Sequence, residues 1–94
     1  MNKSILDEAK EIIYGDREKT YGHPAKNLMV IAKMWQAYFQ AKGETLQTYI
    51  TPQDVAVMMM LLKCARLGND PEHRDSLVDA AGYAALIEIG RAHV

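Results

Sequence analysis

One segment of the sequence strongly limits what the chain can fold into: residues 55–62 are an unbroken apolar run. The segment Thr51-Pro52-Gln53-Asp54 before it is a strong helix start. Threonine caps a helix, proline suits the first turn, and Asp54 stands at the capping-box position. We expect a helix from Pro52 to about Leu67, closed by Gly68. A helix that is apolar all round is buried on several sides. In a chain of 94 residues this predicts burial by a second copy.

The rest of the chain also carries helix signals. Ser4 is the expected cap of a helix that reaches about Tyr14. Pro24 opens a second helix, which Gly43 ends. Asp70-Pro71 opens a fourth, which reaches about Ile89. We predict an all-α fold, with one domain over residues 1–94: a small bundle of about four helices with an oligomeric core, in which the last two form an antiparallel hairpin. The side chains expected to face inward from the fourth helix are Leu77, Val78, Ala81, Ala84, Ala85 and Leu86.

Composition excludes several classes of protein. The 11 basic and 12 acidic residues give a net charge of −1, which argues against a broad nucleic-acid surface. No stretch approaches the roughly 18 apolar residues that span a membrane. Asp7 and Glu8 interrupt the N-terminus before an apolar run could form a signal peptide. We therefore expect a cytoplasmic protein that binds neither membranes nor long nucleic acids. The single cysteine, Cys64, is expected to be buried.

The predicted hairpin brings two cations opposite two carboxylates. Lys63 and Arg66 are three residues apart and share one face of the third helix. Asp75, Asp79 and Tyr83 share one face of the fourth. Two interpretations stay open. The groups form interhelical salt bridges that set the register of the helices, or they form a polar site where the aspartates hold Mg²⁺ or orient the cations toward phosphate.

A second candidate site lies between the first two predicted helices. Basic side chains gather there beside a helix N-terminus, which is a natural place for a phosphate. Tyr21 adds a ring that could stack on a base. The alternative is a solvated loop in which Asp16 and Glu18 neutralise the neighbouring cations. The candidate ligand-binding residues are Arg17, Lys19, Tyr21, His23, Lys26 and Asn27.

Motifs for nucleophilic catalysis are missing from the sequence. Ser4 and Ser76 lie outside any Gly-x-Ser-x-Gly elbow, and there is no P-loop or dinucleotide fingerprint. His73 has no second histidine at metal-ligand spacing. We therefore predict no catalytic residues and no cofactor.

Several motifs taken together point to a family. They are Gly15-Asp16-Arg17, Tyr21-Gly22-His23-Pro24 with Asn27, Thr51-Pro52-Gln53-Asp54-Val55, Leu62-Lys63-Cys64-Ala65-Arg66-Leu67 and Asp75-Ser76-Leu77-Val78-Asp79-Ala80-Ala81-Gly82-Tyr83. This set, which covers nearly the whole chain, resembles a small family of bacteriophage and prophage proteins. The third and fourth predicted helices separately resemble the second half of MazG-like all-α nucleoside-triphosphate pyrophosphohydrolases. In those enzymes an acidic helix binds Mg²⁺, a preceding Lys/Arg helix helps to hold phosphates, and the proteins are dimers or tetramers.

The sequence departs from the MazG-like pattern in its carboxylates. Those enzymes carry a Glu-x-x-Glu pair on the helix before the acidic one, whereas residues 55–66 here contain no carboxylate. Glu8 and Glu11 have this spacing, but they lie on the first predicted helix. Hydrolysis would therefore require Asp75, Asp79, Glu8 and Glu11 to hold Mg²⁺ together.

The leading hypothesis is a non-catalytic, homo-oligomeric protein that binds a phosphorylated nucleotide. The resemblance to phage proteins implies that it sequesters a cyclic nucleotide or a related immune signal in the host bacterial cytoplasm, as an anti-defence sponge. One alternative is a Mg²⁺-dependent, MazG-like pyrophosphohydrolase. Another is a protein-interaction module that docks through residues 58–62. In the leading hypothesis Arg17, Lys19, Lys26, Lys63 and Arg66 contact phosphate, Tyr21 or Tyr83 stacks on a base, and Asp75 and Asp79 orient the cations or contact a base edge.

Overall fold

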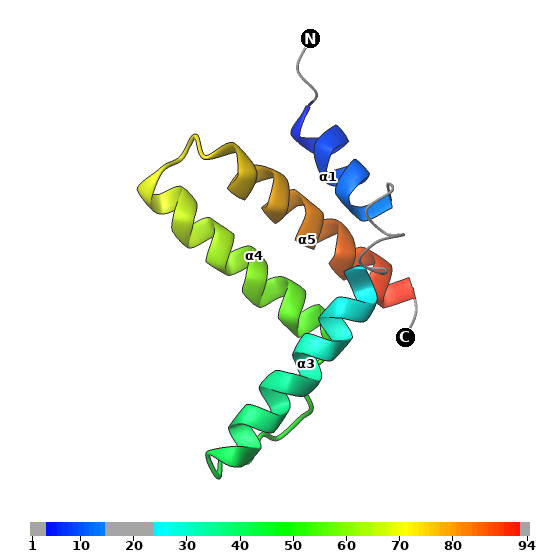
Figure 1. The fold of residues 1–94 in the computed structure, drawn as a ribbon, viewed down its shortest axis with the longest axis vertical. Coiled ribbons are helices and arrows are strands. Elements are labelled where there is room, and N and C mark those ends of the chain that lie inside the picture. The colour runs from blue at the N-terminus through cyan, green and yellow to red at the C-terminus, as the bar shows by residue number, and fades with distance from the viewer. Residues whose placement is uncertain (1–3, 15–23, 93–94) are drawn as a thin grey trace.

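The computed structural model describes residues 4–14 and 24–92, with side chains for 4–14 and 26–88. These residues form four helices and no strand: α1 (Ile5–Tyr14), α3 (Pro24–Ala41), α4 (Pro52–Asn69) and α5 (Arg74–Ala92) (Figure 1). The predicted all-α fold is therefore confirmed for the described part of the chain. No helix within it is long and apolar enough to span a membrane.

Three predicted helix ends follow from local hydrogen bonds and backbone geometry. The Ser4 hydroxyl accepts a hydrogen bond from the Asp7 amide at 3.1 Å and so caps α1. Thr51 and Asp54 form the expected capping box: the Asp54 amide donates to Thr51 Oγ1 at 3.1 Å, and the Thr51 amide donates to Asp54 Oδ2 at 2.9 Å. Gly43 follows α3 with a φ of 81°, a conformation that glycine adopts most readily.

Two boundaries near the α4–α5 connection differ from the prediction. Gly68 does not close α4, which continues to Asn69. Asp70-Pro71 does not open α5, which begins at Arg74. Asp70 instead forms a turn, because its carbonyl accepts from the His73 amide at 3.1 Å and its Oδ1 accepts from the Glu72 amide at 3.2 Å. An aspartate that bonds the backbone two residues ahead favours a turn over a helix start.

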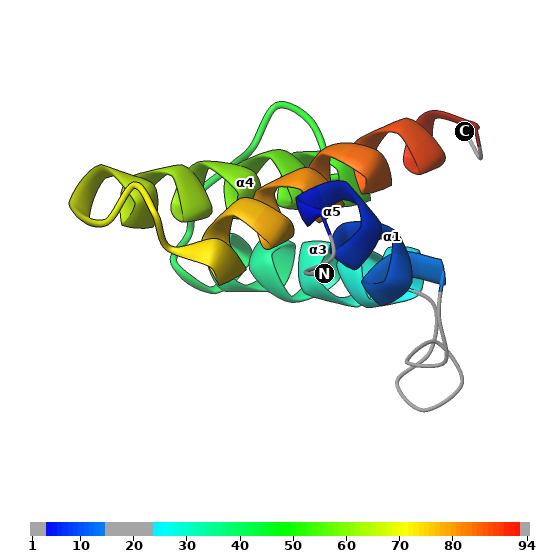
Figure 2. The ribbon, with the colours of Figure 1, turned by 90° about the horizontal axis from the view of Figure 1, so that it is seen from above.

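Helix α5 lies at the centre of the packing, since it contacts α1, α3 and α4. Both ribbon views show α4 and α5 side by side, with α1 against α5 (Figures 1 and 2). The second half of α3 extends past the ends of these helices (Figure 1). Trp35 packs against the core from α3, as its apolar spacing suggests. The buried core consists of Ile13, Leu28, Ala32, Val55, Ala56 and Leu86.

The inward face of α5 is narrower than predicted. Val78 and Leu86 are buried as expected, but Ala84 is exposed. Gly82 is buried in its place, because the buried positions on α5 follow the four-residue spacing from Val78 through Gly82 to Leu86. Gly82 faces α1 here, and a Cβ on it would make ordinary van der Waals contact with the Ile13 side chain at 3.8 Å.

Among the residues that the structure describes, helix α4 is packed on one side and largely open on the other. Val55 and Ala56 are fully buried and Met59 and Met60 are half-buried, whereas four large apolar side chains are open to solvent. The prediction that Cys64 is buried is wrong for the single chain, because Cys64 lies on the uncovered side. The open side chains and their exposed fractions are Val57 (39%), Met58 (48%), Leu61 (59%) and Leu62 (45%).

Candidate functional site

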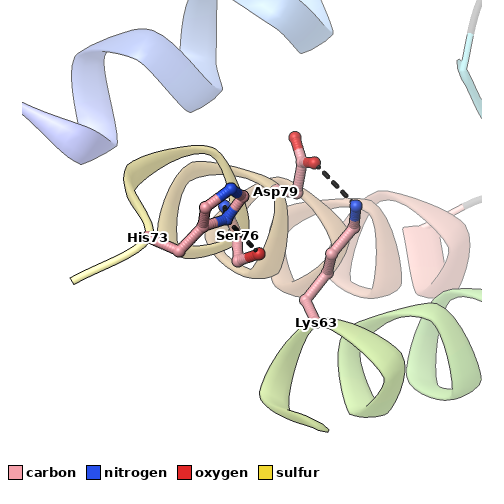
Figure 3. Close-up of polar contacts among 4 residues, drawn as sticks. All are labelled: Lys63, His73, Ser76 and Asp79. Carbon is pink, nitrogen blue, oxygen red and sulfur yellow. Dashed lines mark hydrogen bonds and ion pairs between the residues drawn. The ribbon is translucent and has the colours of Figure 1, made fainter. Parts of the chain in front are cut away.

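The predicted contact between cations and carboxylates forms at one of its two positions. Lys63 Nζ lies 3.0 Å from Asp79 Oδ2, and Figure 3 shows Lys63 reaching from α4 to Asp79 on α5. The lysine side chain is 13% exposed and the aspartate 35%. A charge this sheltered is expensive to leave without a partner. The contact is an interhelical salt bridge, which is one of the two interpretations of this cluster.

Arg66 and Asp75 do not form the second pair. Both side chains are exposed, and neither makes an ion pair within the part of the chain that the structure describes. Asp75 lies in the first turn of α5, where a carboxylate favours the positive end of the helix dipole. Tyr83 is half-buried and packs against the core, so it is less open for stacking than the sequence suggested. The exposed guanidinium of Arg66 is thus the more available cation on α4.

The predicted phosphate site between the first two helices is described only in part. Arg17, Lys19, Tyr21 and His23 lie outside the described residues. Lys26 and Asn27 are exposed near the N-terminus of α3, as expected. The positive end of the α3 dipole is therefore accompanied by an exposed lysine.

The four-carboxylate metal site of the alternative hypothesis is not assembled. Glu8 forms a salt bridge with Arg74, which joins α1 to the first turn of α5. Asp79 is paired with Lys63. Among the described residues, no three His, Cys, Asp or Glu side chains are grouped closely enough to hold a metal ion. Glu8 and Asp79 therefore have cationic partners, and they do not face Asp75 and Glu11 across a common metal.

His73 and Ser76 form a polar contact that the sequence analysis did not predict. His73 Nδ1 lies 2.7 Å from Ser76 Oγ and 3.3 Å from the Ser76 amide nitrogen (Figure 3). The His73 carbonyl also accepts from the Leu77 amide at 3.2 Å, so His73 is the N-cap of α5. Ser76 is only 1% exposed, so the contact caps the helix and does not offer a nucleophile. The three-residue spacing from His73 to Ser76 was the available signal.

A polar pocket of ≈ 360 Å³ lies at the far end of α3. Gln36 and Gln40 of α3 and residues 44–49 line it. The Ile50 amide donates to Gln36 Oε1 at 2.8 Å and so ties the end of this loop to the helix. None of the predicted ligand-binding residues that the structure describes lines the pocket. The amide and hydroxyl groups that line the pocket come partly from a helix and partly from an irregular loop. Residues placed in this way follow no regular spacing, so the sequence alone did not indicate the pocket.

Comparisons with known proteins place the chain among phage proteins. It matches the family described as "Domain of unknown function (DUF6378)" over residues 4–89. It is 43% identical over 88 residues to the Gene 55 protein of Mycobacterium phage D29, and 46% identical over 85 residues to the Gene 55 protein of Mycobacterium phage L5. These matches cover 94% and 90% of this chain, but 54% and 51% of the relatives. The chain thus spans about half the length of both. No solved structure matches it significantly.

The expected resemblance to a phage family is confirmed by these relatives. None of the matches is a MazG-like pyrophosphohydrolase, so that part of the resemblance stays a prediction. The matched region runs from the Ser4 cap into the last turns of α5, and it includes both described salt bridges. The chain belongs to the DUF6378 family and has homologues in mycobacteriophages.

Proposed function

We propose that this chain is a non-catalytic protein that binds a phosphorylated nucleotide. The observation that carries the proposal is the pairing of Asp79 with Lys63 and of Glu8 with Arg74. A metal-dependent hydrolase needs such carboxylates for its metal ions. Here a cation from a neighbouring helix neutralises each of them. This arrangement argues against hydrolysis through a metal bound by these carboxylates.

The cations that remain on the surface supply the binding site in this proposal. Arg66 is exposed on α4, and its planar guanidinium matches phosphate with two parallel hydrogen bonds. Lys26 is exposed near the N-terminus of α3, where the helix dipole also favours an anion. Arg17 and Lys19 precede it in the sequence. With α4 and α5 taken as an antiparallel hairpin, Asp79 would hold Lys63 in a fixed orientation beside this surface.

The phage relatives support a more specific ligand class. A phage protein that binds a nucleotide without changing it acts by lowering the free concentration of that nucleotide. We therefore propose that the ligand is a cyclic nucleotide or a related signal of bacterial immunity, bound in the host cytoplasm. This step rests on the origin of the relatives, whereas the absence of catalysis rests on the paired carboxylates and the binding step on the exposed Arg66 and Lys26.

A depletion experiment tests the binding step. The protein is mixed with a panel of nucleoside triphosphates, cyclic di- and trinucleotides and cyclic ADP-ribose isomers, then removed by filtration, and the free nucleotides are measured by chromatography. We expect at least one nucleotide to be depleted. Lys26→Gln should weaken that depletion, whereas Lys33→Gln removes another exposed lysine from the same helix and should leave it unchanged. No depletion by micromolar protein would contradict the proposal.

The open side of α4 favours a second function, which is protein association. Residues 58–62 were predicted to dock another protein, and the structure leaves Met58, Leu61 and Leu62 exposed. Contiguous exposed apolar surface of this kind marks interaction sites in soluble proteins. This second function is compatible with nucleotide binding, because the two use different side chains.

A further inference from the structure

The uncovered side of α4 is a continuous apolar stripe, which we call the α4 outer face. It consists of Val57, Met58, Leu61, Leu62, Cys64 and Ala65, and all six are exposed. Their spacing places them on one side of the helix over about two turns. Lys63, the one charged residue within this segment, turns toward Asp79 on α5 and away from the stripe. The α4 outer face therefore has no charge in its centre.

The chain exposes more surface than a compact monomer of its size. Its accessible surface is 7046 Å², against about 5,500 Å² for a compact monomer of 10.6 kDa. Its radius of gyration is 14.7 Å, against about 12 Å for a compact chain of 94 residues. The surplus of about 1,500 Å² exceeds the roughly 800 Å² that each partner buries in a standard interface. The chain as a whole therefore exposes enough extra surface for a standard interface, and the exposed α4 outer face is part of that surface.

The charges at the ends of the α4 outer face indicate how a second copy would lie. Asp54 precedes the stripe in the first turn of α4, and Arg66 follows it in the last. In an antiparallel pair of α4 helices centred near residue 60, each Asp54 approaches Arg66 of the other copy. A parallel pair would instead place like charges together. The antiparallel arrangement also aligns the helix dipoles favourably, and the guanidinium keeps donors free for a phosphate.

We propose that a second copy of this chain packs antiparallel across the α4 outer face and forms a symmetric dimer. The same surface then faces itself across a two-fold axis, as symmetric dimers require. The central contacts join the exposed methionine and leucine side chains of the two copies. This dimer buries the apolar helix that the sequence predicted to be buried on several sides. It does not depend on nucleotide binding, since it rests on surface area and apolar exposure.

The mass in solution tests the proposal. We expect sedimentation equilibrium of the wild type at tens of micromolar to give twice the 10.6 kDa of one chain. Leu61→Glu places charges at the centre of the interface and should give single chains. Leu6→Glu is the matched control, because Leu6 is 73% exposed on α1, and it should stay dimeric. Circular dichroism checks that each variant is folded, and Met58→Lys repeats the test on the same face. A monomeric wild type, or a dimeric Leu61→Glu variant, would overturn the proposal.

Cysteine crosslinking tests the orientation of the two copies. In the antiparallel arrangement, Cys64 of one copy lies opposite Val57 of the other, whereas the two Cys64 residues are about two helical turns apart. Val57→Cys should therefore form covalent dimers on mild oxidation, while the wild type should not. Disulfides need Cα atoms within about 7 Å, so the Val57→Cys variant and the wild type should differ clearly in the amount of covalent dimer. Crosslinking of the wild type through Cys64 would show that the helices are parallel and would contradict the proposed arrangement.

Discussion

The ammonium of Lys63 lies 3.0 Å from the carboxylate of Asp79 and joins α4 to α5. The two partners are not equally sheltered, because Lys63 is 13% exposed and Asp79 is 35% exposed. Loss of the carboxylate leaves a sheltered cation without a counter-charge, whereas loss of the lysine leaves an anion that water still reaches. The salt bridge therefore predicts an asymmetric response to substitution.

Asp79→Asn should lower the free energy of unfolding by about 1–3 kcal/mol, less than for a fully buried pair because solvent screens part of the charge. Lys63→Met should cost less, since methionine packs in place of the lysine stem. Urea denaturation of both variants measures the difference. Equal losses of unfolding free energy in the two variants would contradict this prediction, because they would show that water reaches Lys63 and Asp79 to the same degree.

Magnesium should have little effect on the stability of the ligand-free protein. Glu8 and Asp79 already have cationic partners, so the described carboxylates offer no joint site for a divalent ion. We expect the Tm in millimolar Mg²⁺ to stay within about 1 °C of its value in EDTA at matched ionic strength. A rise of several degrees would mean that the carboxylates do cooperate on a metal, and it would favour the hydrolase.

The N-cap of α5 should contribute measurably to stability. His73→Ala removes the side chain that contacts both the amide and the hydroxyl of Ser76, and should cost about 1 kcal/mol. His73→Asn supplies another good N-cap and should recover most of this loss. Urea denaturation gives the free energies. If His73→Asn is as destabilising as His73→Ala, then packing of the imidazole ring, and not capping, is what His73 contributes.

The two glycine positions should respond in opposite directions. Gly82 lies inside α5, and a Cβ there would make ordinary contact with Ile13 at 3.8 Å. Gly82→Ala should therefore stabilise the protein by about 0.5–1 kcal/mol. Gly43 has a φ of 81°, so Gly43→Ala should destabilise it by about 1 kcal/mol. Thermal unfolding of both variants checks the signs. A loss of stability in Gly82→Ala would show that α1 and α5 pack more closely than described.

The sequence predicted those features of the fold that depend on neighbouring residues. The cap at Ser4, the capping box at Thr51 and the stop at Gly43 each rely on backbone groups a few residues away. The prediction was wrong at Asp70-Pro71, because the same residue types serve both helix starts and turns. The turn is distinguished from a helix start by the hydrogen bonds that the Asp70 carbonyl and carboxylate accept from His73 and Glu72.

Features that depend on tertiary packing were predicted less well. The contact between Lys63 and Asp79 was expected, because the two residues lie at similar distances on either side of the short connection between their helices. The salt bridge between Glu8 and Arg74 joins residues 66 positions apart, and no local pattern indicates it. The apolar run of α4 indicated burial, but helical periodicity cannot tell which side a partner covers. Cys64 was therefore assigned to the core although it lies on the open side.

The fate of a bound nucleotide tests the central claim most directly. The protein is loaded in Mg²⁺ with whichever nucleotide it depletes, washed and denatured by heat, and the released material is identified by chromatography. Binding without catalysis predicts that the nucleotide returns intact and in the amount that was removed. Recovery as a monophosphate or a linearised product would contradict the account, because it would show that the paired carboxylates are released to serve a catalytic metal.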